Sequence, residues 1–207
     1  MEYKTVKSLG SAEIVERRSR FISTVAPVED EQAALDFIAD IKQRYWDAKH
    51  NVFAYILRNS NIKRYSDDNE PHSTAGLPTL GVLEKSGLTD CAIVTTRYFG
   101  GVLLGTGGLV RAYSAAAKSA VETVGIVAVK ECSVCRILCD YNLYGKIESM
   151  LRENNIAVEK AEFLQDVSLT VCIPSGDTEA VREKLIDLSF GKTDLSVIGK
   201  KFAKFDV

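Results

Sequence analysis

Five glycines crowd into residues 100–108, and this stretch constrains the fold more than any other part of the chain. It lies between an apolar, strand-like run at residues 91–98 and an alanine-rich, helix-like run at residues 109–124. Glycine loses more conformational entropy on folding than other residues. A dense cluster therefore indicates either a tight backbone turn or the close approach of another molecule.

The helix after the glycines is expected to begin near Gly108, where unpaired amide groups and the helix dipole favour an anion. Arg111 would then fall in the first turn, where a cation opposes the dipole unless a phosphate is bound nearby. The predicted phosphate-binding residues are Arg97, Arg111 and the turn Gly105, Thr106, Gly107 and Gly108. The alternative is structural, with glycines that only let the helix pack closely on a sheet.

A second unusual segment is the acidic loop, residues 67–74, with the sequence Asp-Asp-Asn-Glu-Pro-His-Ser-Thr. Its carboxylates and hydroxyls could hold Mg²⁺ beside a phosphate. They could equally make local turns in a solvated loop. We expect a functional surface here, formed by Asp67, Asp68, Glu70 and Thr74.

Lys49 and His50 follow the first predicted helix, residues 29–45, and are expected to line the same surface. A lone histidine is more often a cation at a helix end or a satisfied buried group than a catalyst. The sequence has no Gly-x-Ser-x-Gly motif, so it gives little support to serine hydrolase chemistry.

The charge balance limits the kinds of partner. The chain has 26 basic and 28 acidic side chains, a net charge of −2, so contact with a nucleic acid would need a local basic patch. No apolar run approaches the roughly 18–20 residues of a membrane-spanning helix, and we expect no membrane partner. Five cysteines, an odd number, predict reduced thiols and a cytoplasmic location.

Three of these cysteines, Cys132, Cys135 and Cys139, suggest a metal site at first sight. On a strand, however, Cys132 and Cys135 point to opposite faces, and Cys135 and Cys139 lie about 13 Å apart. No matching histidine or cysteine group supplies the missing ligands. We therefore predict that these thiols are small buried hydrophobic groups.

The order of predicted elements divides the chain into residues 1–128 and residues 129–207. The first part mixes strands and helices in the manner of a sheet covered by helices. The second reads β-α-β-β-α-β, which is the ferredoxin-like plan. The predicted fold class is therefore α+β, in two domains.

Four segments of the first part resemble the motifs of the IMPACT family, in its bacterial (YigZ-like) branch. They are Arg18–Ile22, Asp47–His50, Ser66–Pro78 and Arg97–Tyr113. The resemblance implies a domain like the second domain of ribosomal protein S5, followed by a ferredoxin-like domain similar to the last domain of elongation factor G. The chain departs from the family pattern at Asn69 and at His72-Ser73, where glycine or a small residue is usual.

The resemblance also implies a function, because eukaryotic relatives regulate translation and the S5-like fold occurs in RNA-binding translation proteins. The expected function is that of a non-enzymatic protein that binds RNA or a ribosomal component, with no cofactor. One alternative is an enzyme acting on a nucleotide or phosphoester, with Mg²⁺ on the acidic loop. Another is an adaptor that binds a protein partner.

Overall fold

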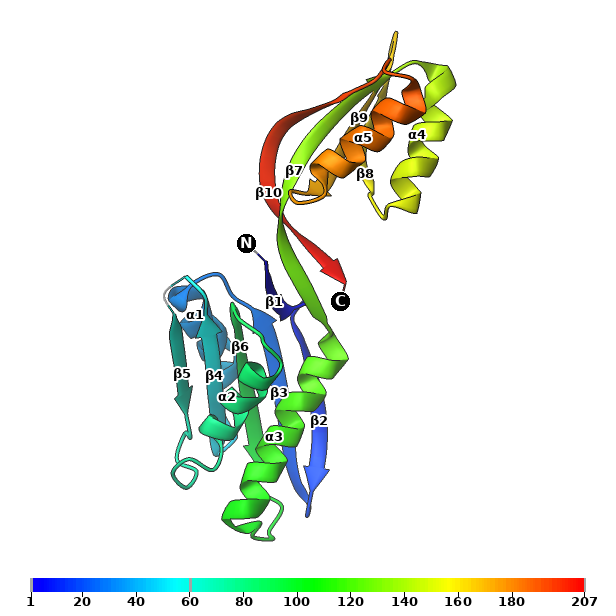
Figure 1. Cartoon of the computed structure of the whole chain (residues 1–207). Helices are drawn as coiled ribbons and strands as arrows, with labels where there is room; N and C mark the ends of the chain where they lie inside the picture. The colour runs from blue at the N-terminus through cyan, green and yellow to red at the C-terminus, as the bar shows by residue number, and fades with distance from the viewer. Residues whose placement is uncertain (1, 60, 207) are drawn as a thin grey trace. The chain divides into compact units, whose positions relative to one another are not determined.

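Residues 2–59 and 61–206 are described by the computed structural model, in which they form two units (Figure 1). The first unit contains residues 3–128 and residue 206. The second contains residue 2 and residues 129–205. The chain passes from the first unit to the second along the strand β7 (Ile126–Cys139).

A five-stranded antiparallel sheet, in the order β2-β3-β6-β4-β5, forms the centre of the first unit. The strands of this unit are β1 (Tyr3–Val6), β2 (Gly10–Glu16), β3 (Ser19–Pro27), β4 (His50–Leu57), β5 (Ile62–Ser66) and β6 (Cys91–Tyr98). Its helices are α1 (Glu31–Arg44), α2 (Gly76–Lys85) and α3 (Gly105–Val124).

The central strand β6 is buried on both faces, because side chains along a strand alternate between the two sides of a sheet. Ala92 and Val94 pack against α1. Cys91 and Ile93 pack against α2 and α3 on the opposite face. The layers are therefore one helix, the sheet, and two helices, and the end of β6 is held firmly between them.

The second unit has the predicted β-α-β-β-α-β order. Its elements are β7, α4 (Tyr141–Glu153), β8 (Val158–Phe163), β9 (Val167–Pro174), α5 (Thr178–Ser189) and β10 (Leu195–Asp206). Strand β7 pairs with β9 and β10, and β9 pairs with β8. Both helices cover one face of this sheet, where Cys135, Ile137 and Cys139 join a common core with Ile147 and Leu185.

The α+β fold predicted from the sequence is confirmed, with two strands added. The short strand β1 was not expected. Strand β5, which directly precedes the acidic loop, was not expected either. Most of its side chains are exposed, and it forms one edge of the sheet. Within the described residues, no helix has the length and the hydrophobicity to cross a membrane.

Candidate functional site

Strand pairing brings three elements of the predicted site to one end of the first sheet. Arg97, near the end of β6, lies opposite His50 of β4 and opposite Phe21 of β3. The guanidinium packs over the rings of Phe21 and Phe99, at 5.5 and 5.6 Å from their centroids. Only 6% of Arg97 is exposed, so its charge needs a partner inside the protein.

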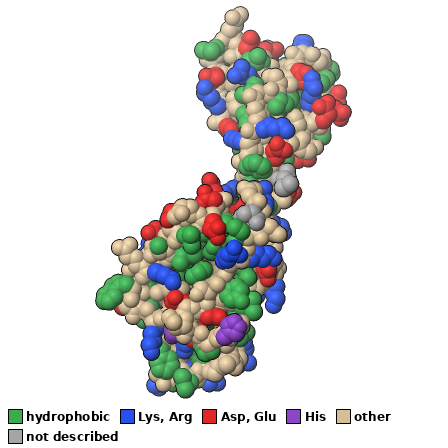
Figure 2. Space-filling model, turned by 90° about the vertical axis from the view of Figure 1, so that its left-hand side faces the viewer, with side chains coloured by type: hydrophobic (Ala, Val, Ile, Leu, Met, Phe, Trp, Pro, Cys, Tyr) green, Lys and Arg blue, Asp and Glu red, His purple; other side chains and the backbone are tan. Residues whose placement is uncertain are grey.

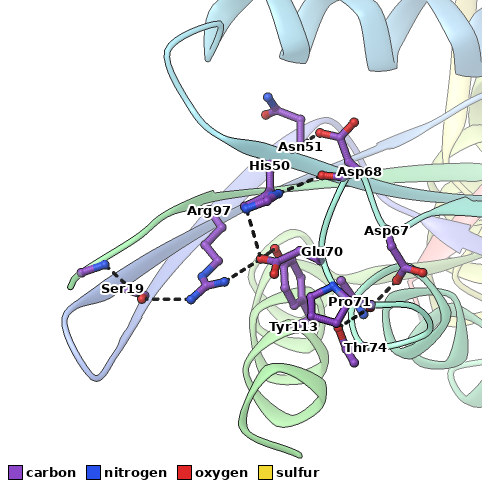
Figure 3. A network of polar contacts seen from close by, with 12 residues as sticks. Ser19, His50, Asn51, Asp67, Asp68, Glu70, Pro71, Thr74, Arg97 and Tyr113 are labelled. Carbon is purple, nitrogen blue, oxygen red and sulfur yellow. Dashed lines mark hydrogen bonds and ion pairs between the residues drawn. The ribbon is translucent and has the colours of Figure 1, made fainter. Parts of the chain in front are cut away.

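The partner is Glu70 of the acidic loop, which lies at the centre of a buried network (Figure 3). Its Oε1 atom accepts a hydrogen bond from Nη1 of Arg97 at 2.7 Å and another from the hydroxyl of Tyr113 at 2.8 Å. His50 Nε2 lies 4.0 Å from the same oxygen. Burial and the Glu70 charge raise the pKa of Tyr113, so its hydroxyl keeps its proton.

Ser19 connects this network to the glycine-rich stretch. Its hydroxyl lies 3.5 Å from Nη2 of Arg97 and accepts a hydrogen bond from the amide of Gly100 at 3.2 Å. A Cβ atom placed on Gly100 would lie 2.0 Å from the carbonyl carbon of Arg18. Gly100 is therefore required by the close approach of two backbone segments, the loop after β6 and the turn before β3.

The carboxylate of Asp67 holds the acidic loop against the start of α2. It accepts hydrogen bonds from the amides of Ser73, Ala75 and Gly76, at 2.8, 3.1 and 2.8 Å. Helix α2 has no side-chain cap at Ala75, so Asp67 supplies the acceptor that its first amides need. Thr74 closes the turn by donating its hydroxyl to the carbonyl of Pro71 at 2.7 Å.

Asp68 ties the same loop to the other face of the sheet. Its carboxylate accepts a hydrogen bond from the amide of Asn51 at 2.6 Å and pairs with Lys42 of α1 at 3.1 Å. Its carbonyl lies 2.8 Å from Nδ1 of His50. The backbone is left-handed at Asp68, Asn69 and Ser73. At Asn69 and Ser73 this conformation fits the glycine that the resemblance to the family implies.

The three carboxylates of the loop are thus engaged by a guanidinium, an ammonium or backbone amides. Across residues 2–59 and 61–206, no three histidine, cysteine, aspartate or glutamate side chains gather in a way that could hold a metal ion. The loop is a structural clamp whose carboxylates point at protein groups. The geometry gives no specific support to the magnesium-dependent alternative.

Two details of the glycine turn differ from expectation. Helix α3 begins at Gly105 rather than near Gly108, so Arg111 lies in the second turn and not in the first. Arg97 is not at the surface beside it, because its buried charge is paired with Glu70. The structure therefore separates the two arginines: Arg97 stabilises the network, and Arg111 is exposed.

Arg111 instead faces the turn between β2 and β3. Arg111 and Arg17 line the same cavity of about 190 Å³, whose wall also includes Glu16 and Gly108. The side chains of Arg17 and the adjacent Arg18 are exposed. Their backbone is left-handed, as the tight turn between the strands requires. We call Arg17, Arg18 and Arg111 the basic rim. For these three arginines the structure records no ion pair within its described residues.

Exposed apolar side chains lie next to the basic rim, on the loop between β6 and α3. Phe99 is 51% exposed and Leu103 is 82% exposed. The first turn of α3 lies beside them, with no side-chain cap and with open space around Gly107. The prediction that Gly105, Thr106, Gly107 and Gly108 bind phosphate is not tested by this geometry and stays a prediction.

Sequence reasoning missed several members of the site. Ser19, Asn51 and Tyr113 are buried members of the site. A polar residue inside an otherwise apolar strand, such as Asn51, was the available signal. Among the predicted residues, His50, Glu70 and Arg97 are brought together, whereas Lys49 is exposed with no recorded role in the network.

Comparison with known proteins identifies the family. Residues 17–121 match the model of the Impact N-terminal domain, and residues 137–192 match a domain of unknown function, DUF1949. IMPACT family member YvyE of Bacillus subtilis is 40% identical over 93% of this chain and 89% of its own length. IMPACT family member YigZ of Escherichia coli is 31% identical over 88% of this chain and 91% of its own length.

A solved structure agrees with these matches. It is titled "Crystal structure of an hypothetical protein", is 29% identical, and superposes with a TM-score of 0.60 over 96% of this chain and 98% of that one. A eukaryotic relative, the protein IMPACT homolog of Dictyostelium discoideum, is 36% identical over 44% of this chain. The motifs, the fold and the relatives agree: the chain belongs to the IMPACT family.

Proposed function

We propose that this IMPACT family member is an RNA- or ribosome-associated protein that acts in the regulation of translation without catalysing a reaction. The basic rim is the observation that carries the proposal. Arg17, Arg18 and Arg111 are exposed, and Arg17 and Arg111 line the same cavity. The β2–β3 turn and the start of α3 lie at the same end of the first unit (Figure 1). Guanidinium groups without internal carboxylate partners are available to phosphate oxygens.

The neighbouring exposed side chains suit single-stranded RNA. Unpaired bases stack on aromatic rings and on arginine planes. Phe99 supplies such a ring beside the basic rim, and the uncapped amides of α3 offer further donors to phosphate. Tyr113 is excluded from this role, because it is fully buried and bonded to Glu70.

The overall charge argues for a local contact rather than a broad one, because the net charge of the chain is −2. On the face shown in Figure 2, basic and acidic side chains are interspersed with apolar and neutral ones, without a large field of one sign. If three arginines neutralise about three phosphates, the logarithm of the binding constant falls with the logarithm of the salt concentration. For single-stranded RNA the expected slope is about −2. Binding of this kind is modest in affinity and weakens only moderately with salt.

The test is binding of the full chain to single-stranded RNA over a salt series, measured by fluorescence anisotropy. The double variant Arg17→Ala, Arg111→Ala is expected to bind about tenfold more weakly and to lower the slope toward about −1. The matched control removes two exposed arginines elsewhere, with Arg44→Ala on α1 and Arg64→Ala on the edge strand β5. This control is expected to bind almost as the parent does.

Two results would contradict the proposal. Equal losses in the test and control variants would show that only total charge matters. If the parent chain binds neither RNA nor isolated ribosomal subunits at low salt, the basic rim is not an RNA-binding surface. A thermal melt of each variant checks that its fold is retained.

A further inference from the structure

Two thiols lie side by side on the face of the second sheet that the helices leave uncovered. In the register of β7 and β9, Cys132 lies opposite Pro174 and Val134 lies opposite Cys172. Cys132 and Cys172 are therefore diagonal neighbours on one face. Cys135 lies three positions after Cys132 on the same strand, so its side chain points to the opposite face. There it belongs to the core beneath α4 and α5.

The two thiols are close enough for the charge of one to affect the other, since burial and the neighbouring Cys172 both raise the pKa of Cys132. The Cys132 thiol itself donates a hydrogen bond to the carbonyl of Lys130, at 3.5 Å. Cys132 is completely buried, whereas Cys172 is partly exposed. An incoming reagent therefore reaches Cys172 first, and Cys132 is its diagonal neighbour on the same face.

A charged bridge crosses the same face. Lys201 of β10 binds both carboxylate oxygens of Glu159 of β8, at 2.6 and 2.8 Å, and so spans the strands β7 and β9 that carry the thiols. The ammonium group lies near the thiols, where it offsets part of the rise that burial causes in the pKa of Cys132. A cation beside a thiol favours its thiolate form.

We propose that Cys132 and Cys172 are a site of reversible oxidation, which reacts with small disulfides of the glutathione type to form an intramolecular disulfide between β7 and β9. The Cys172 thiolate attacks one sulfur of the disulfide, forms a mixed disulfide and releases one glutathione thiolate, which takes up a proton. Cys132 then loses its proton and attacks the Cys172 sulfur, and the second glutathione leaves as a thiol. Two protein thiols are oxidised and one glutathione disulfide is reduced.

The geometry indicates a labile bond rather than a permanent one. Diagonal neighbours in a sheet have Cα atoms roughly 7–8 Å apart, whereas a relaxed disulfide needs less than about 7 Å. The strands must shift slightly to close the bond, and a strained disulfide is easily reduced again. Burial raises the pKa of Cys132 to about 11, so the closing step is expected to accelerate with rising pH.

The experiment treats the reduced, folded full chain with oxidised glutathione and follows its mass. The parent chain is expected to lose the mass of two hydrogen atoms and to keep three of its five thiols, and peptide mapping is expected to join Cys132 to Cys172. Cys132→Ser is expected to stop at a mixed disulfide, one glutathione on Cys172. Cys172→Ser is expected to stay unmodified.

Cys135→Ala is the matched control, because it removes a neighbouring thiol of the same strand from the opposite face. It is expected to form the same disulfide as the parent. A parent chain that keeps all five thiols when folded, but is oxidised after unfolding in denaturant, would overturn the proposal. A disulfide that maps to any other cysteine pair would overturn it too, and neither result depends on how the variants fold.

Discussion

Glu70→Gln is expected to destabilise the first unit by about 3–5 kcal/mol, because it leaves the buried charge of Arg97 without a counter-ion. Glutamine still accepts a hydrogen bond but carries no charge to offset the desolvation of the guanidinium. The loss is the penalty of an unpaired buried ion, and it exceeds the net contribution of the intact pair. Hydrogen exchange of the α3 amides measures it, since these amides report unfolding of the first unit.

The exposed pair of Arg20 and Glu13 provides the control. Its guanidinium and carboxylate make two hydrogen bonds of 2.9 and 3.0 Å, yet both side chains are largely in water. Arg20→Ala is expected to cost less than about 1 kcal/mol. Equal costs for Glu70→Gln and Arg20→Ala would show that the Glu70 network is not a buried ionic centre. Glu70→Leu combined with Arg97→Met is expected to recover part of the stability.

Gly100→Ala is expected to destabilise the first unit by about 3 kcal/mol or more, the upper end of overpacking effects. The new methyl group would overlap backbone atoms, since its position lies 2.0 and 2.1 Å from the carbonyl carbon and oxygen of Arg18. A backbone carbonyl in a tight turn cannot rotate away as a side chain can. The same substitution would also displace the amide of Gly100 from Ser19.

Gly107→Ala is the matched control for this prediction. Gly107 lies in the first turn of α3, with no atom within 4 Å of the position that a Cβ would take. Alanine there is expected to stabilise the helix by about 0.5–1 kcal/mol. Exchange of the α3 amides compares both variants under one condition. A stable Gly100→Ala variant would mean that the turn at Arg18 relaxes freely.

The sequence predicted the layers of the first unit well, because hydrophobic periodicity decides which face of an element is buried. The apolar, strand-like run at residues 91–98 is β6, and the end of this strand at Arg97 lies beside the acidic loop. What could not be predicted is the pairing of Arg97 with Glu70. Twenty-seven positions separate the two residues, and only the folded chain decides which ion pairs become buried.

Of the basic rim, Arg111 was among the predicted residues, and Arg17 and Arg18 were missed for a similar reason. Arg17 and Arg18 occupy a turn between two strands, and their left-handed backbone does not follow from residue type, since glycine or asparagine is usual there. The same holds for Cys132 and Cys172, which lie 40 positions apart and meet only through the register of β7 and β9. Strand register is a long-range property that local sequence patterns do not specify.

The carboxylate of Asp67 has a consequence for the kinetics of local opening. Loops usually exchange their amide hydrogens and admit proteases without unfolding of the rest of the domain. In this acidic loop, however, the amides of Ser73, Ala75 and Gly76 are bonded to Asp67, and Glu70 is held inside the core. Opening of the acidic loop breaks a buried ion pair and uncaps a helix at the same time. We therefore expect this loop to open as slowly as the most stable part of the first unit. Proteases are expected to cleave it no faster than that unit unfolds.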